Sequence, residues 1–127
     1  MGFTVGIDLG TTNSCVAYCE NNQAKVLADE RQQSITPSVV AFTDTGEVLV
    51  GETAKRQAAS NAEYTIYAAK RLIGRVFGTD LASRAIESVN YYCKEGPSGD
   101  IRLVIRGKEY SLPEISAHIL RHLKEYA

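Results

Sequence analysis

Two common phosphate-binding signatures are missing from this chain of 127 residues. Neither a Gly-x-x-x-x-Gly-Lys-Ser/Thr loop nor a Gly-x-Gly-x-x-Gly fingerprint occurs anywhere in it. The chain also lacks an excess of either charge, since 14 basic residues face 15 acidic ones, and we expect neither nucleic acid nor an anionic membrane as a partner. No apolar run approaches a membrane span, and no basic segment or cleavage site indicates a signal peptide. The length fits one typical domain.

Cysteine is scarce, with only Cys15, Cys19 and Cys93 present. Cys15 and Cys19 lie four positions apart on one expected strand, too far from each other to form a disulfide. A chain without a disulfide framework indicates the reducing cytoplasm. We expect all three cysteines to be small buried apolar residues, and the alternative is a redox-sensitive Cys15.

The most informative segment that is present covers residues 3–18, which read as two strands joined by a turn of glycine and hydroxyl residues. Gly10 can adopt the backbone angles of a tight turn, and Thr11 and Thr12 add hydroxyl donors to backbone N–H groups that can converge on an anion. Asp8 would repel a phosphate unless a cation lay between them, which suggests a hydrated magnesium ion. An ordinary hairpin is the alternative, and spacing alone does not decide between them.

The rest of the chain predicts a mixture of short strands and helices. Strands are expected at residues 25–28, 39–42, 48–50, 89–94, 101–106 and 108–112. Helices are expected at residues 51–61, 65–73 and 79–86. A subdomain boundary is expected near Pro37.

The last segment predicts an amphipathic helix that begins with a Ser-x-x-Glu signal at residues 111–114. Its apolar stripe consists of Ile115, Ile119, Leu120, Leu123 and Tyr126. Because no stop signal follows the stripe, we expect the chain to be the N-terminal part of a longer protein.

His118 and His122 stand four residues apart on the same helix, a spacing that can chelate a metal. They share their face with Glu114 and Glu125 and lack a His-Glu-x-x-His pattern, so we expect a solvated polar face instead.

Several separate segments together resemble the seventy-kilodalton heat-shock protein family of chaperones, most closely its DnaK type. The segments are residues 6–14, 36–38, 50–58, 70–75 and 114–117. The resemblance implies an α/β fold of the actin-like, ribonuclease H-like ATPase kind, of which the chain is the first lobe. Residues 1–36 resemble the inner subdomain, residues 37–112 the outer subdomain, and residues 113–127 the start of a helix that returns to the inner subdomain.

The resemblance also implies roles for particular residues. The family's phosphate loop matches Gly10, Thr11, Thr12 and Asn13, which would contact the β and γ phosphates of ATP or ADP. The aspartate that orders waters of the bound Mg²⁺ matches Asp8. The catalytic lysine matches Lys70, whose ammonium would reach the γ-phosphate, although most lysines are simply exposed.

Four further basic residues are expected to take no part in catalysis. Arg71 and Arg75 are expected to be structural or cleft-lining charges, and Lys55 and Arg56 to lie on the surface of the outer subdomain near the nucleotide entrance.

The function implied is an ATP-dependent chaperone that couples hydrolysis to binding and release of unfolded polypeptides, with a J-domain co-chaperone and a nucleotide exchange factor as partners. The second phosphate loop, the adenosine pocket and the peptide-binding domain would follow Ala127, so we expect this chain alone to be inactive. A sugar kinase of the same superfamily and a non-catalytic interaction module are the alternatives.

Overall fold

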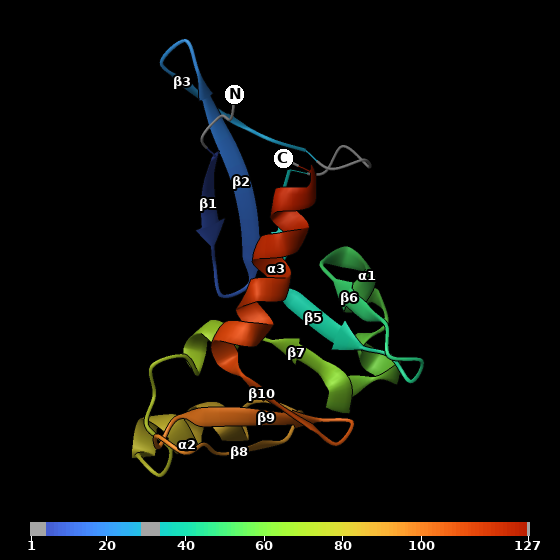
Figure 1. Cartoon of the computed structure of the whole chain (residues 1–127), viewed down its shortest axis with the longest axis vertical. Helices are drawn as coiled ribbons and strands as arrows, with labels where there is room; N and C mark the ends of the chain where they lie inside the picture. Colours follow the sequence, from blue (N-terminus) through green and yellow to red (C-terminus); the bar gives the residue numbers. More distant parts are fainter. Residues whose placement is uncertain (1–4, 29–33, 127) are drawn as a thin grey trace.

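The computed structural model describes residues 5–28 and 34–126, and its strands form three antiparallel sheets around one long helix, α3 (Leu112–Tyr126). In Figure 1 this helix stands upright, with the first sheet beside its upper part and the last sheet at its foot. The strands are β1 (Val5–Leu9), β2 (Asn13–Glu20), β3 (Gln23–Val26), β4 (Thr36–Pro37), β5 (Val39–Phe42), β6 (Val48–Val50), β7 (Thr65–Tyr67), β8 (Cys93–Glu95), β9 (Ile101–Ile105) and β10 (Lys108–Ser111). The shorter helices are α1 (Glu52–Arg56), α2 (Asp80–Glu87) and the 3₁₀ turns η1 (Ala58–Ser60), η2 (Ala62–Tyr64) and η3 (Ala69–Arg71).

The first sheet has the strand order β1-β2-β3, and β4 also pairs with β2. The predicted opening hairpin is confirmed, with Leu9 opposite Ser14 and Asp8 opposite Cys15. The third strand begins at Gln23, slightly earlier than expected, because Asn21 and Asn22 alone make the turn, with φ of 53° and 61°. Asparagine tolerates this left-handed conformation better than most residues.

The second sheet, β6-β5-β7, contains the clearest error of the sequence analysis. The helix predicted at residues 65–73 is wrong, because Thr65–Tyr67 is a strand that pairs with β5 and only Ala69–Arg71 is helical. Residues 65–67 are β-branched or aromatic, and pairing buries the Ile66 side chain almost completely. Pairing with β5 and burial of Ile66 therefore outweigh the helix propensity of the residues that follow, on which the predicted helix depended.

The helix predicted at residues 51–61 is real but shorter, since α1 ends at Arg56 and a 3₁₀ turn follows. The Gln57 side chain terminates it by donating from Nε2 to the Ala54 carbonyl at 2.6 Å and to Thr65 Oγ1 at 2.9 Å. The amide thus ties the end of α1 to the start of β7.

The third sheet has the order β10-β9-β8 and is accompanied by α2. In β9, buried Ile101, Leu103 and Ile105 alternate with less buried residues, as expected of a strand with one face on the core. The predicted α2 is confirmed, with the Thr79 hydroxyl accepting from the Ala82 N–H at its start. The strand expected at residues 89–94 starts only at Cys93.

Helix α3 begins with the predicted reciprocal capping pair. The Ser111 N–H donates to Glu114 Oε1 at 3.0 Å, and the Glu114 N–H donates to Ser111 Oγ at 3.2 Å. These bonds hold the pKa of the Glu114 carboxyl below its usual range.

The apolar stripe of α3 is confirmed for Ile115, Ile119 and Leu123, which are buried, but Leu120 remains 39% exposed. The Tyr126 side chain lies outside the described part of the structure. His118 departs from the expected solvated face, because it is half-buried and meets the Phe42 ring edge-on at 5.9 Å. Burial, together with Arg121, lowers its pKa.

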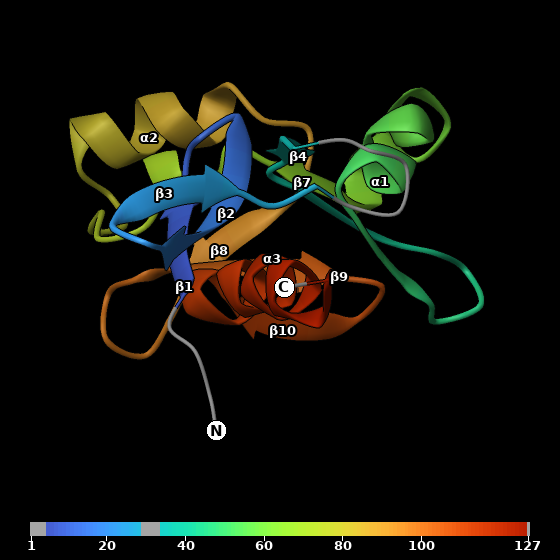
Figure 2. The same ribbon diagram turned by 90° about the horizontal axis from the view of Figure 1, so that it is seen from above.

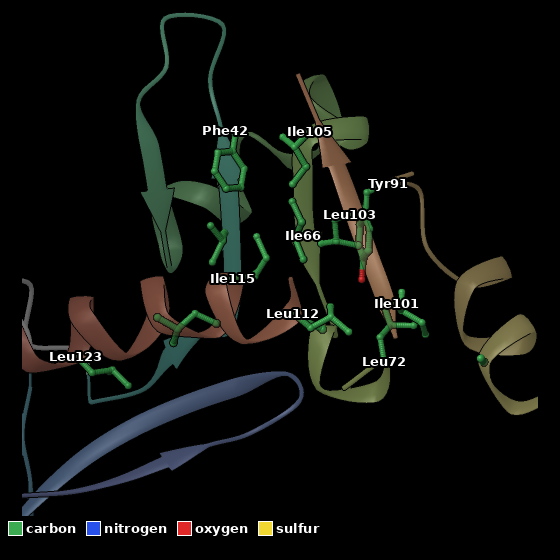
Figure 3. Packing of buried hydrophobic residues seen from close by; sticks show 14 of the residues in the cluster. Phe42, Ile66, Leu72, Tyr91, Ile101, Leu103, Ile105, Leu112, Ile115 and Leu123 are labelled. Atoms are coloured by element: carbon green, nitrogen blue, oxygen red, sulfur yellow. The ribbon is translucent and has the colours of Figure 1, made fainter. Parts of the chain in front are cut away.

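One continuous core connects the sheets. Figure 3 shows Phe42, Ile66, Leu103 and Ile115 meeting from β5, β7, β9 and α3. Val16 of β2 belongs to the same cluster, so the first sheet shares the core with the other two. Figure 2 looks down α3 and shows the first sheet and α1 on different sides of it. Helix α3 therefore connects the first sheet with the part of the molecule that contains α1.

All three cysteines are free, as expected, but the prediction that all are buried is wrong. Cys19 is exposed, and Cys15 and Cys93 are partly buried. Burial raises the pKa of the Cys93 thiol to about 11, which keeps it protonated at neutral pH. In the described residues no helix is long and apolar enough to cross a membrane.

Candidate functional site

The turn between β1 and β2 is so tight that only glycine fits at position 10. The Gly10 N–H donates to the Asn13 carbonyl at 3.1 Å, and this bond closes the turn. A Cβ atom at Gly10 would collide with the same carbonyl oxygen. Any other residue would therefore force the loop open.

A second set of hydrogen bonds fixes the loop from the side of β4. The Ser38 N–H donates to the Thr12 carbonyl at 2.8 Å, and the Ser14 and Ser38 hydroxyl oxygens lie 2.7 Å apart in a buried hydrogen bond. Within the described residues, the backbone N–H groups of Thr11 and Thr12 donate to no protein acceptor. The turn is thus rigid while two donors stay available for an anion.

Asp8 precedes the turn on β1 and is exposed. Its partner in the register is Cys15, so the two side chains share the face of the sheet opposite to buried Val16. No cation of the described chain forms an ion pair with the Asp8 carboxylate. One carboxylate suits a hydrated magnesium ion, which keeps most of its waters. Among the described residues no group of three or more His, Cys, Asp or Glu side chains could enclose a metal directly.

Lys70 reaches the same turn from a segment 61 positions later in the sequence. Its Nζ donates to the Leu9 carbonyl at 2.9 Å, directly before Gly10. Figure 1 shows the β1–β2 turn pointing toward the segment that carries η3. A surface lysine in a basic helix would have no such partner, and the helix itself is a single 3₁₀ turn. The structure therefore brings together the residues proposed from the sequence: Asp8, Gly10, Thr11, Thr12, Asn13 and Lys70.

A cavity of about 390 Å³ lies beside the turn. Thr11 and Thr12 line one part of it, and Lys55 and Arg71 bring positive charge to it. Their positions agree with the expectation of a cleft-lining or structural Arg71 and of a Lys55 near the nucleotide entrance. The other two basic residues make local contacts: Arg56 Nε lies 3.3 Å from Glu52 Oε1, and Arg75 donates to the Arg71 carbonyl at 3.3 Å.

Sequence reasoning missed two residues of this region. Ser38 was noticed only within its segment, although its N–H and hydroxyl hold the turn. Ala68 lines the cavity and has a left-handed backbone, with φ of 55° and ψ of 28°. Nothing in the identity of an alanine signals that conformation, because alanine rarely adopts it.

A family model described as "Hsp70 protein" matches residues 4–127, nearly the whole chain. The chain belongs to the Hsp70 family. Membership in the Hsp70 family implies the actin-like ATPase fold, and the mixed strands and helices around α3 agree with it. It also supports assigning the chain to the nucleotide-binding domain of a chaperone. The subdomain boundaries and the roles of individual residues remain predictions.

Proposed function

We propose that the full-length Hsp70 protein containing this chain hydrolyses ATP with Mg²⁺, and that residues 8–13 and Lys70 form the first half of its active site. One observation carries the proposal: the Lys70 ammonium lies 2.9 Å from the Leu9 carbonyl, at the mouth of a turn with unused backbone donors. A cation and converging N–H groups at one position suit a phosphate chain.

Each group has a distinct task in this site. The free N–H groups and hydroxyls of Thr11 and Thr12 bind phosphate oxygens and fix their position. Asp8 would hold the metal through hydrogen bonds that its carboxylate accepts from metal-bound waters. Lys70 supplies a compact positive charge where the equatorial oxygens of the transferred phosphoryl group accumulate negative charge. Bound Mg²⁺ would neutralise part of the charge on the phosphate oxygens.

The chaperone cycle is part of the same proposal. Hydrolysis would be coupled to binding and release of unfolded polypeptides, with a J-domain co-chaperone and a nucleotide exchange factor as partners in the cytoplasm. Membership in the Hsp70 family supports client and co-chaperone interactions in general. The match along residues 4–127 removes the support for a sugar kinase.

The decisive experiment replaces Lys70 by alanine in the full-length protein. We expect single-turnover hydrolysis of ATP to fall by about 10²–10³-fold, because one oriented charge is worth that much in the transition state. The equilibrium affinity for ATP should change by less than about threefold, since the charge stabilises the transition state more than the ground state.

Lys25→Ala is the matched control, because Lys25 is an exposed lysine paired with Glu20 at 3.4 Å. It lies opposite Tyr18, near the end of β2 that is away from the β1–β2 turn. This variant should hydrolyse ATP at the parent rate. If Lys70→Ala loses affinity while its bound-state rate survives, Lys70 only binds nucleotide. A parent protein without any hydrolysis would favour a non-catalytic interaction module.

A further inference from the structure

Ala68 has the least expected backbone conformation in the described chain. The other non-glycine residues with positive φ are Asn21, Asn22 and Arg106. All three lie in tight turns between antiparallel strands, where left-handed residues are needed. Ala68 lies in no hairpin, and it has a φ of 55° between β7 and η3. Residues in such sparsely populated φ and ψ regions are common at functional sites.

The chain is held firmly on both sides of Ala68. Before it, Tyr67 pairs with Val39 in the sheet, and its carbonyl accepts the Tyr91 hydroxyl at 2.7 Å. After it, Ala69 and Leu72 are buried in the core. The two anchored flanks are connected through the φ and ψ angles of Ala68, so a residue that disfavours these angles would shift η3 relative to β7.

The start of β7 is anchored by a further set of hydrogen bonds. Thr65 Oγ1 donates to the Asn61 carbonyl at 2.7 Å and accepts from Gln57 Nε2 at 2.9 Å. Asn61 Nδ2 in turn donates to the Phe42 carbonyl at 3.2 Å and to Gln57 Oε1 at 2.8 Å. This network fixes the strand from which the turn at Ala68 departs.

Lys70 follows the turn by two residues, and its Nζ ends 2.9 Å from the Leu9 carbonyl. A right-handed or extended Ala68 would rotate η3 relative to β7 and move the base of the lysine side chain. We propose that Ala68 is a positioning residue for Lys70: its left-handed conformation aims the ammonium at the phosphate turn. The inference rests on the proposed function and adds to it the element that sets the geometry of the lysine.

The test compares three variants in the full-length protein. Valine at position 68 strongly disfavours the left-handed region because its side chain is β-branched. Asparagine is also larger than alanine but tolerates that region, and glycine adopts it freely. We expect Ala68→Val to lower the single-turnover hydrolysis rate at least tenfold with less than threefold change in ATP affinity, because small misplacements of a catalytic group are costly. Ala68→Asn and Ala68→Gly should recover most of the rate that valine loses.

Asn22→Val is the matched control for backbone strain, since Asn22 has a φ of 61° in the β2–β3 turn. It should lower thermal stability without the loss in rate. If Ala68→Val does not fold, Ala68→Leu gives the same comparison with a milder penalty, because leucine is not β-branched.

Three outcomes would overturn the inference. The first is a parent-like rate in Ala68→Val. The second is an equal loss in valine and asparagine variants, which would point to the size of the side chain in the cavity. The third is a loss of affinity with an intact bound-state rate. Failure of the proposed function is separate, because it would appear as full hydrolysis by Lys70→Ala.

Discussion

Two side chains of opposite charge approach the β1–β2 turn from different parts of the chain. Asp8 belongs to the strand that leads into the turn, whereas Lys70 comes from η3 and touches the Leu9 carbonyl. A negative and a positive group therefore both lie next to the turn that carries the N–H groups of Thr11 and Thr12. Such a pair can hold a phosphate and its metal together without a closed cage of protein ligands.

Asp8→Asn in the full-length protein tests the negative member of the pair. The amide has nearly the same shape, so folding should be unaffected, but it lacks the charge that would order the waters of the proposed metal. We expect slower hydrolysis and a shift of its magnesium dependence to higher concentration. The measurement is the hydrolysis rate against magnesium concentration for both proteins. Superimposable curves would mean that Asp8 merely ends a strand.

The sequence identified Asp8, Gly10 and the threonines because their chemistry is local: a glycine turn, hydroxyl donors and a carboxylate within six positions. Lys70 was found only through the family resemblance, since its contact with Leu9 spans 61 positions. The role of Ala68 could not be predicted at all. Backbone angles of an alanine depend on how β7 and η3 are anchored, and that information is tertiary.

At the scale of elements, α3 shows which kinds of pattern are reliable. Its start was predicted from Ser111 and Glu114, and its buried face from the spacing of Ile115, Ile119 and Leu123. Signals of this kind lie within one turn or one face of the helix and need no partner. The strand β7 is the opposite case, because a three-residue segment becomes a strand only when β5 lies beside it.

Two leucines of α3 provide a matched test of its packing. Leu123 is fully buried, whereas Leu120 is 39% exposed. We expect Leu123→Ala to lower the free energy of unfolding by about 2–5 kcal/mol, because it leaves a cavity in the core. Leu120→Ala should lower it by about 1 kcal/mol or less, because most of that side chain is not enclosed. Urea unfolding followed by circular dichroism measures both.

Equal losses for the two leucine variants would contradict the placement of the core face. The helix propensity of alanine is the same at both positions, so it cannot produce a difference between them.

At the scale of the whole molecule, the sheets share one core, and the β1–β2 turn lies beside a cavity that would form only part of the proposed nucleotide site. The groups available at this turn are hydroxyls, backbone N–H groups, the Asp8 carboxylate and the basic side chains of Lys55, Lys70 and Arg71. The 127-residue sequence contains no second Gly-Thr-Thr turn that could bind the phosphates from another side.

We therefore expect the chain of residues 1–127 on its own to bind ATP more weakly than micromolar and not to hydrolyse it. Micromolar affinity requires about 8 kcal/mol of binding free energy, which a one-sided site does not provide. Isothermal titration calorimetry with ATP and magnesium measures the affinity directly, with a magnesium-free titration as the control. A micromolar or tighter dissociation constant would show that these residues suffice for binding.

The position of α3 in the chain has a consequence for synthesis on the ribosome. This helix packs against β1, β2, β5, β6, β9, β10 and η3, and all of them precede it in the sequence. During translation the strands emerge first, and the apolar side chains that α3 covers stay exposed until its 15 residues are made. At typical translation speeds that interval lasts about 1–3 s, and apolar surface exposed in this way is prone to aggregation. We therefore expect the shared core of this Hsp70 family member to close only when α3 has been synthesised.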